Sequence, residues 1–283
     1  MNQEEILIIG AYGQLGRALK LKYPDAKAID SDSLDITNKQ ALESFNWNGI
    51  KTIINAAAYT NVDGAETAEG RVLAWKVNAV APSLLAKIAD KYDKTLVHIS
   101  TDYVFDGNEK THTEDEPYSP LSVYGQSKAA GDISVSLMSK YYLLRTSWVI
   151  GDGKNFVRTM LDLGKKGINP SVVSDQIGRL TFTGELVRAI DYLLQHKSPY
   201  GIYNVTNSGE PKSWANIAKE IFKLAGLKST VTDVTTKQYY EGKTGIAPRP
   251  LNSVMDLTKL HQTGFVSNDW YNNLEEYIKE EEY

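Results

Sequence analysis

The sequence predicts an α/β fold, a doubly wound parallel sheet followed by a smaller C-terminal α/β lobe. Two observations predict the sheet. The short apolar run Ile6–Ile9 leads into a glycine-rich turn and then a helical pattern, and further apolar runs at residues 52–58 and 96–99 each precede another helical stretch. Continuous apolar runs are typical of strands buried on both faces, and their alternation with helices predicts parallel strands joined by crossover helices.

The glycine-rich turn predicts a dinucleotide site. It contains Gly10, Gly13 and Gly16, and it lies between an apolar strand and a helix. Glycine lets the backbone turn sharply and approach a pyrophosphate, while the helix N-terminus offers free N–H groups and the positive end of its dipole. A glycine triplet alone is weak evidence, and the strand-to-helix context makes it specific for a Rossmann-type sheet.

The second strand is expected over residues 26–30 and ends in Asp30. A carboxylate about 20 residues after the glycine turn accepts hydrogen bonds from ribose hydroxyls and favours NADH over NADPH. Arg17, inside the first helix, favours the opposite choice because a guanidinium pairs with the extra phosphate of NADPH. The cofactor therefore stays open between NADH and NADPH, and a helix cap or turn role is the alternative for Asp30.

Two more stretches are expected beside the dinucleotide. Asp35 and Ile36 lie in a segment placed where an adenine would bind, just before a helical stretch over residues 38–45. The third strand, residues 52–58, ends in small side chains that allow the backbone to approach the nicotinamide half, and the alternative is that they only permit tight packing. These small side chains are Ala56, Ala57 and Ala58.

The stretch from residue 96 to residue 128 carries the predicted catalytic groups. A buried strand delivers Ser100, Thr101 and Asp102 to its carboxyl end, where open α/β sheets bind ligands. If the following segment is helical, Tyr124 and Lys128 lie one turn apart on one face. Reduction of a ketone needs a proton donor, here the tyrosine, and a second donor that holds the oxygen, here the threonine. The lysine is expected to lower the pKa of the tyrosine.

The pattern Tyr-x-x-x-Lys is common by chance in a tyrosine-rich chain. It occurs three times, beginning at Tyr23, Tyr124 and Tyr239. The first copy contains Pro24, and the third has Gly242 before its lysine. Only the middle copy follows a strand that ends in Ser-Thr, so it is the predicted catalytic copy.

Residues 1–150 are expected to form the dinucleotide-binding domain with the catalytic residues, and residues 151–283 mainly a substrate-binding lobe interleaved with it. Trp148 is expected near a strand end, as an apolar wall for a sugar ring or as a core residue. Asn78, in a long helical pattern, either holds backbone near the site or is satisfied within the core. Residues 231–240 have no assignment. Strands are expected at 141–150 and 201–206, and helices at 68–92, 155–165, 183–195, 214–225 and 270–283.

Composition excludes several other classes of function. The 283 residues contain no cysteine, which rules out disulfides, thiolate zinc sites and thiol catalysis. The four histidines are scattered without the spacing of metal ligands, so no metal site is expected. A net charge of −4 provides no basic surface for nucleic acid or for an anionic membrane. The apolar run near the N-terminus is too short for a signal peptide or a membrane span, and a cytoplasmic enzyme is expected.

Taken together, these motifs resemble the extended short-chain dehydrogenase/reductases and, more narrowly, the dTDP-4-dehydrorhamnose reductase family. The resemblance covers essentially the whole chain. The glycine turn and Tyr-x-x-x-Lys occur across the superfamily, whereas the Ser-Thr-Asp-Tyr-Val-Phe and Arg-Thr-Ser-Trp blocks are more specific. The matching blocks begin at Gly13, Leu34, Asn55, Val62, Ser100, Tyr124, Arg145, Asp175 and Arg249.

The resemblance implies reduction of the 4-keto group of dTDP-4-dehydro-L-rhamnose to dTDP-L-rhamnose by NADH or NADPH. It implies that Thr101, Tyr124 and Lys128 are catalytic and that Thr101, Asp102 and Trp148 contact the sugar. The resemblance also implies which residues contact the cofactor. These are Gly13, Gln14, Leu15, Asp30, Asp35, Ile36, Ala56, Ala57, Ala58, Tyr59, Tyr124 and Lys128.

The chain departs from the family pattern at a few positions. Some family members form a dimer bridged by magnesium held by glutamates, and Glu185 fits one such place. Ala18 and Tyr271 stand where other carboxylates are expected, so a monomer or weak homodimer is predicted. Gly64 replaces a commonly larger residue, and Leu180 replaces the usual proline, which predicts differences in the sugar-nucleotide pocket.

Two alternatives remain beside this function. The first is a reductase of another 4-keto nucleotide sugar, because pocket loops rather than the catalytic trio choose the substrate. The second belongs to a different class, since the regulatory subunit of methionine adenosyltransferase also resembles this family and acts by binding a partner. Retention of the trio Thr101, Tyr124 and Lys128 favours catalysis.

Overall fold

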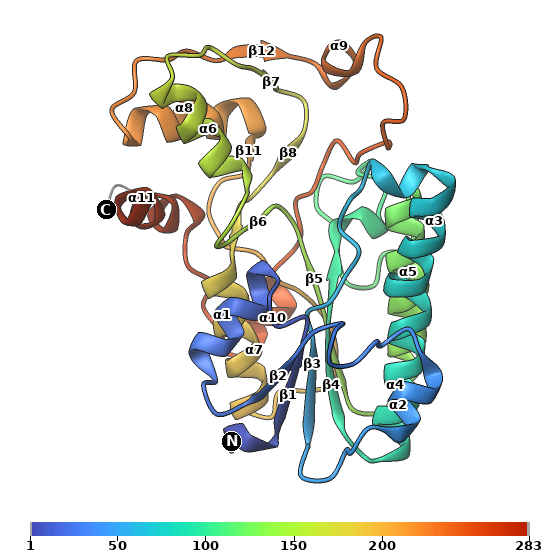
Figure 1. Ribbon diagram of the computed structural model, residues 1–283. Helices are drawn as coiled ribbons and strands as arrows, with labels where there is room; N and C mark the ends of the chain where they lie inside the picture. The colour runs from blue at the N-terminus through green and yellow to red at the C-terminus, as the bar shows by residue number, and fades with distance from the viewer. Residues whose placement is uncertain (1, 282–283) are drawn as a thin grey trace.

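A parallel six-stranded sheet forms the centre of the computed structural model, which describes residues 2–281 (Figure 1). The strand order is β10-β5-β4-β3-β1-β2, and every neighbouring pair is parallel. The direction of winding reverses between β1 and β3, and ligands of open α/β sheets bind beyond the carboxyl ends of the strands at such a point. The predicted fold class is confirmed. The strands are β1 Ile6–Ile9, β2 Lys27–Ile29, β3 Thr52–Asn55, β4 Thr95–Thr101, β5 Tyr141–Thr146 and β10 Gly201–Asn204.

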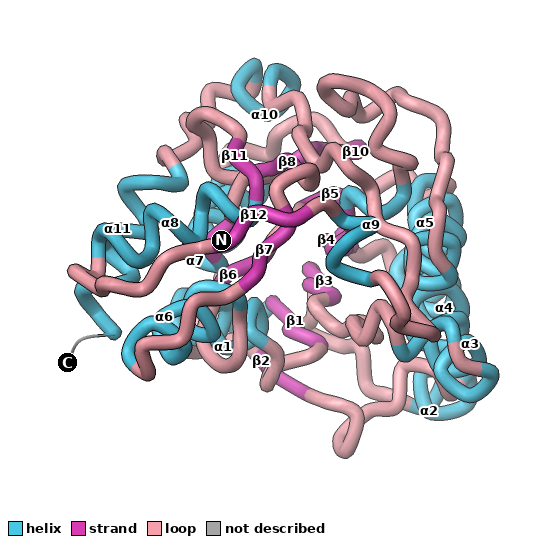
Figure 2. The backbone as a smooth tube through the Cα atoms, turned by 90° about the horizontal axis from the view of Figure 1, so that it is seen from above, coloured by secondary structure: helices cyan, strands magenta, loops and turns pink. Residues whose placement is uncertain are grey.

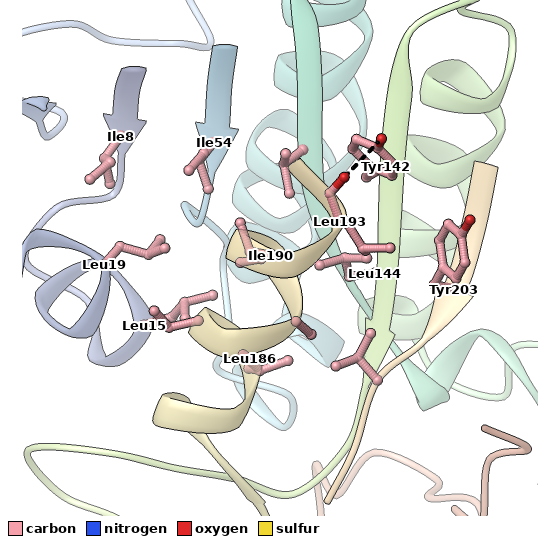
Figure 3. Packing of buried hydrophobic residues seen from close by; sticks show 14 of the residues in the cluster. Ile8, Leu15, Leu19, Ile54, Tyr142, Leu144, Leu186, Ile190, Leu193 and Tyr203 are labelled. Carbon is pink, nitrogen blue, oxygen red and sulfur yellow. Dashed lines mark hydrogen bonds between the residues drawn. The ribbon is translucent and has the colours of Figure 1, made fainter. Parts of the chain in front are cut away.

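Helices cover both faces of this sheet. Along β1, Ile6 and Ile8 pack on one face, whereas Leu7 and Ile9 pack on the other, as the two-residue period of a strand requires. The first face is covered by α1 Gln14–Lys22 and α7 Thr183–Gln195, whose leucines and isoleucines meet the sheet in Figure 3. The second face is covered by α2 Lys39–Ser44, α4 Ala81–Lys91 and α5 Val123–Ser136.

The predicted long helix over residues 68–92 contains an irregular turn. It consists of α3 Ala68–Trp75, the π-helical turn η3 Lys76–Val80 and then α4. Within the described part of the chain, Ala68–Lys91 is long and apolar enough to cross a membrane, and 50% of its most apolar window is buried in this structure. Core helices of globular proteins meet the same criteria, and this stretch packs along α5.

A second, smaller part of the molecule contains three two-stranded sheets (Figure 2). The chain passes between the two parts more than once, because α7 packs on the large sheet and β10 pairs with β5. The strand pairs are β6 Val149–Ile150 with β9 Thr181–Phe182, β7 Ser171–Val173 with β12 Thr232–Val234, and β8 Ile177–Gly178 with β11 Lys212–Ser213. The helices of this part are α6 Phe156–Lys165, α8 Trp214–Leu224, α9 Thr236–Tyr240 and α11 Trp270–Glu281, whereas α10 Thr258–Gln262 packs against β10 of the large sheet. The 3-10 turns Gln3–Glu5 and Asp102–Val104 adjoin β1 and β4 of the large sheet, and the 3-10 turn Gly64–Glu66 precedes α3.

Three expected elements differ from the structure. The strand predicted over residues 141–150 is two strands, because Trp148 adopts a positive φ of 48° and β6 then pairs with β9 in another sheet. The strand predicted over 52–58 ends at Asn55, whose side-chain oxygen accepts the Ala57 N–H at 3.2 Å and turns the chain. Residues 201–206 form a strand only to Asn204, and the unassigned 231–240 contain β12 and α9. The last two residues of the predicted helix 270–283 lie outside the described range.

We expect Leu186→Ala to lower the free energy of unfolding by about 2–5 kcal/mol, because a fully buried leucine leaves a cavity between α7 and the sheet. Leu21→Ala is the matched control, since Leu21 is 86% exposed and the same truncation should cost less than about 0.5 kcal/mol. Urea unfolding of both variants measures the difference. Equal losses would contradict the assignment of this core.

Candidate active site

A cavity of about 290 Å³ lies at the carboxyl ends of β1, β2 and β3. It sits at the point where the winding of the sheet reverses, where a dinucleotide is expected. Most of the predicted cofactor residues line it, whereas the side chain of Leu15 packs in the core and Gln14 lines a different cavity. Its lining contains Gly10, Gly13, Asp30, Asp35, Ile36, Ala56, Ala57 and Ala58, together with Ile9, Ser31, Leu34, Thr37 and Val77.

Close backbone contacts explain why the turn after β1 needs glycine. Gly10 has a φ of +81°, and a Cβ there would lie 2.6 Å from the amide nitrogen of Ala57. A Cβ on Gly16 would lie 2.0 Å from the carbonyl oxygen of Gly10. Gly10 therefore lets the β1 turn lie against the loop after β3, which lines the same cavity, and Gly16 lets the start of α1 lie against the turn.

Asp30 has the turn role that the sequence left open, and it also lines the cavity. Its carboxylate accepts the backbone N–H of Tyr12 at 3.2 Å and that of Ser31 at 2.7 Å, so it supports the turn. Arg17 is held elsewhere, because its guanidinium donates to the main-chain oxygens of Tyr12 and Asp152 and lies 2.9 Å from the Asp152 carboxylate. Asp30 therefore lines this cavity, whereas Arg17 lines a different, larger cavity.

The catalytic trio is brought together by β4 and α5. Thr101 is the last residue of β4, and Tyr124 and Lys128 lie in the first two turns of α5. Ser122 begins this helix by accepting the Gly125 N–H at 3.1 Å. All three predicted catalytic side chains are buried, and Thr101 acts to lower the pKa of the neighbouring Tyr124.

Burial has the largest effect on the pKa values of Tyr124 and Lys128. Burial raises the pKa of Tyr124 above its ordinary value, and the hydrogen bond from Thr101 offsets only part of that increase. The sequence predicts the opposite direction, through Lys128, but the lysine Nζ donates to the carbonyl oxygen of Ile99 at 2.6 Å. Burial also lowers the pKa of Lys128 to about 8. The phenol is therefore neutral at physiological pH.

Asp102, which directly follows β4, is held in place by hydrogen bonds at the carboxyl end of that strand. It is only 2% exposed, and its carboxylate accepts hydrogen bonds from Thr101 at 3.0 Å and from Ser253 at 2.5 Å. Burial raises the pKa of Asp102 to about 6, although these two hydrogen bonds act in the opposite direction. Ser253 comes from a late loop and was not predicted, although it lies in the Arg-Pro-Leu-Asn-Ser block beginning at Arg249.

A second contact made by the C-terminal segment lies near the carboxyl end of β4. Arg249 donates to Asp63 at 2.9 Å, and the Ala247 N–H donates to the same carboxylate at 3.0 Å. Burial alone raises the pKa of Asp63, but these hydrogen bonds hold it below its ordinary value. The ion pair joins the loop after β3 to the C-terminal segment that also supplies Ser253, and sequence reasoning missed it because the partners are far apart in the chain.

The structure shows the contacts of Asn78 and Trp148, the two residues whose roles the sequence left open between the site and the core. The Asn78 side chain accepts the Tyr59 N–H at 2.9 Å and donates to the Tyr59 carbonyl at 3.0 Å, so it holds the backbone of the loop after β3. Trp148 is half-buried and stacks on Trp214 with ring centroids 3.7 Å apart. A Cβ on Gly178 would lie 2.8 Å from the Trp148 ring, so glycine at that position lets the ring lie flat.

The other two Tyr-x-x-x-Lys copies have local structural roles. Tyr23 is 2% exposed and donates to Asp191 on α7 at 2.9 Å. Tyr239 lies on α9, and the Lys243 Nζ lies 4.0 Å from its ring centroid. Tyr23 follows the C-terminal end of α1, and Tyr239 lies in the smaller part, so neither stands in the first turn of a helix that packs on β4, as Tyr124 does.

A larger cavity of about 830 Å³ lies between α1, α7 and α11, away from the trio. Glu185 and Ala18 both line it, whereas Tyr271 packs against the core of the smaller part. The Glu185 carboxylate is engaged by the Asn268 N–H at 3.0 Å and by Arg188. Within residues 2–281, no group of three or more histidine, aspartate or glutamate side chains is placed to hold a metal ion.

Comparisons with known proteins agree with this architecture. The model of the RmlD substrate binding domain family matches residues 4–283. The chain is 40% identical over 290 residues to a dTDP-4-dehydrorhamnose reductase of Aggregatibacter actinomycetemcomitans, which covers 94% of this chain and 95% of that protein. It is 37% identical over 282 residues to a probable dTDP-4,6-dihydroxy-2-methyloxan-3-one 4-ketoreductase of Streptomyces antibioticus, with 95% and 93% covered.

A solved structure is similar over the same length. The dTDP-4-dehydrorhamnose reductase of Bacillus anthracis str. Ames, in complex with NADP, has a TM-score of 0.88, an identity of 37% and a coverage of 98% of both chains. The family match and these relatives each span nearly the entire sequence. The chain therefore belongs to the RmlD substrate binding domain family of NAD(P)-dependent reductases.

Proposed function

We propose that this chain reduces the 4-keto group of dTDP-4-dehydro-L-rhamnose to dTDP-L-rhamnose, with Tyr124 as the proton donor. The observation that carries the proposal is the convergence of Thr101, Tyr124 and Lys128 at the carboxyl end of β4, in the same sheet that bears the dinucleotide cavity. The relative from A. actinomycetemcomitans supplies the substrate class.

The bound NADH or NADPH supplies the hydride. As hydride reaches the ketone carbon, negative charge develops on the oxygen, and Tyr124 donates the proton that neutralises it. The Thr101 hydroxyl, which donates to the Asp102 carboxylate at 3.0 Å in this structure, turns to donate to the same oxygen. The positive charge of Lys128 stabilises the phenolate left after proton transfer.

The residues proposed to hold the cofactor surround the glycine turn and the loop after β3. The backbone of the turn is suited to the pyrophosphate, and Asp30 is suited to the adenosine ribose. NADP is bound by the B. anthracis relative, and both cofactors stay within the proposal. The proposed set is Gly10, Gly13, Gln14, Leu15, Gly16, Asp30, Asp35, Ile36, Ala56, Ala57, Ala58, Tyr59, Tyr124 and Lys128.

The proposed sugar contacts are Thr101, Asp102 and Trp148, with residues 151–283 supplying most of the substrate-binding part. Because Asp102 is fully engaged by Thr101 and Ser253, it acts on the sugar mainly by orienting the threonine. We further propose a cytoplasmic enzyme that is a monomer or weak homodimer and takes a nucleotide sugar, without nucleic acid or membrane partners.

A reductase of another 4-keto nucleotide sugar is the second candidate. The S. antibioticus relative is named for a different keto-sugar substrate, yet it is nearly as similar to this chain. The catalytic trio does not distinguish such substrates, because it contacts only the reacting carbonyl.

Oxidation of NADPH and NADH by the purified protein tests the substrate. With dTDP-4-dehydro-L-rhamnose, generated from its 4-keto precursor by a separate epimerase, we expect rapid oxidation and formation of dTDP-L-rhamnose. The rates with the two dinucleotides rank the cofactors. Turnover only of the unepimerised precursor would support the second candidate, and no oxidation of either would contradict both.

We expect Tyr124→Phe to lower kcat by about 10²–10⁴-fold, because the ring remains while the proton donor is lost. NADPH affinity, measured by fluorescence titration, should stay nearly unchanged. Tyr239→Phe is the matched control from the exposed copy of the same motif and should retain wild-type turnover. Normal turnover in the Tyr124 variant would rule out this mechanism.

Gly10→Ala should weaken NADPH binding by at least about tenfold, or 1.4 kcal/mol, because the added Cβ displaces the loop after β3. Gly49→Ala is the matched control: Gly49 has a φ of +80° but no atom within 4 Å of an added Cβ. It should lose about 1–2 kcal/mol of stability from the left-handed backbone alone and bind NADPH normally. Similar NADPH affinities in both variants would refute the proposed cavity.

A further inference from the structure

Asp132 belongs to the same buried face of α5 as the catalytic residues. Tyr124, Lys128 and Asp132 follow at four-residue intervals, so they lie on one face of the helix. That face packs against β4 and β5, and Lys128 and Asp132 are only 1% and 0% exposed. The proposed mechanism uses the tyrosine and the lysine but leaves the buried carboxylate without a role.

Two side chains from neighbouring strands hold the Asp132 carboxylate. The Ser100 hydroxyl on β4 donates to Asp132 Oδ2 at 2.7 Å, and the Arg145 Nε on β5 lies 3.6 Å from the same oxygen. Ser100 and Arg145 are direct partners in the β4–β5 register. Arg145 is itself 1% exposed and donates to the carbonyl oxygen of Glu114 at 2.9 Å. The carboxylate is therefore fixed from the sheet side.

Asp132 is the carboxylate whose negative charge favours the ammonium form of Lys128. Burial, together with the charge of Lys128, holds the pKa of His98 well below its ordinary value, so that imidazole is neutral. Burial raises the pKa of Tyr124 and of Tyr118, and both phenols are neutral. The titratable or charged side chains facing this cluster are His98 from β4, Asp102 from the 3-10 turn after β4, Tyr124, Lys128 and Asp132 from α5, Arg145 from β5, and Tyr118 from the loop before α5.

Within this cluster, Asp132 is the carboxylate whose charge acts on both buried cations, Lys128 and Arg145. A buried ammonium without a counter-charge loses its proton, because desolvation penalises the charged form. Guanidinium groups are not deprotonated in proteins, so the lysine is the cation that would change. The carboxylate therefore decides whether the amine beneath Tyr124 is charged at neutral pH.

We propose that Asp132 is a positioning residue that keeps Lys128 protonated, with Ser100 and Arg145 holding its carboxylate in place. The inference rests on the proposed reductase function. It assigns Asp132 no contact with substrate or cofactor. Its effect on catalysis passes entirely through the charge of Lys128.

The sign of the pH dependence follows from these charges. Burial lowers the pKa of Lys128 to about 8, and the attraction of Asp132 acts against that decrease. Activity that needs the ammonium is therefore present below this pKa and lost as pH rises through it. Removing the negative charge lowers the pKa of Lys128 further, so the loss of activity should move to lower pH.

The test compares pH profiles of kcat for ketone reduction in the wild type, Asp132→Asn and Asp132→Glu. The asparagine variant should lose activity at a pH at least about one unit below the wild type, a tenfold change in proton affinity. The glutamate variant retains the charge and should restore most of the profile. A variant with lower activity but an unmoved midpoint would show a merely structural role and overturn the inference.

A milder variant covers the case in which Asp132→Asn does not fold. Ser100→Ala removes the 2.7 Å hydrogen bond but keeps the carboxylate, and it should move the midpoint in the same direction by a smaller amount. An unmoved midpoint in this variant, with Asp132→Asn unfolded, would also overturn the inference.

A binding measurement separates this inference from the proposed function. NADPH affinity, followed by fluorescence titration against pH, should show the same shifted midpoint because Lys128 is a proposed cofactor residue. A wild type that reduces no ketone would refute the function while this binding profile still tests Asp132. An active wild type whose variants show unmoved profiles would refute the inference alone.

Discussion

The contact between α5 and β4 is the interaction on which the site depends. It buries Lys128 and Asp132 almost completely and places Tyr124 beside Thr101. Charged groups removed from water require partners within the protein, and the strands supply them as the Ile99 carbonyl and the Ser100 hydroxyl. The packing of α5 against β4 therefore also sets the hydrogen bonds and the ionisation of these side chains, so a substitution that disturbs the packing alters both.

The same sheet carries the smaller cavity at the carboxyl ends of β1, β2 and β3. The reversal of winding between β1 and β3 opens space beyond their carboxyl ends, and the close approach of Gly10 to Ala57 shapes one wall. On the opposite side, late residues return to the strand mouth, where Ser253 binds Asp102 and Arg249 binds Asp63. The site is thus closed by segments that are remote in sequence, and its substrate contacts depend on how the C-terminal part docks.

Much of this arrangement was predictable from residues close together in the chain. The strand, glycine turn and helix at residues 6–22 follow from local pattern, and α7 occupies the predicted residues. The strand expected over 141–150 fails at Trp148, because its positive φ is a tertiary feature enforced by stacking on Trp214 and by the space over Gly178. The pKa direction of Tyr124 was also missed, since burial is not visible in a spacing of four residues.

By itself the sequence determined the α/β class, the position of the glycine turn, and the placement of Tyr124 and Lys128 one helical turn apart. These are local properties, set by backbone geometry and by periodic burial. Only the tertiary structure decided that Asp132 lies against Ser100 and Arg145, and that Ser253 binds Asp102. Such pairs depend on strand order and register, which bring residues that are distant in the sequence into contact and exclude water from between them. A local sequence pattern does not specify strand order or register.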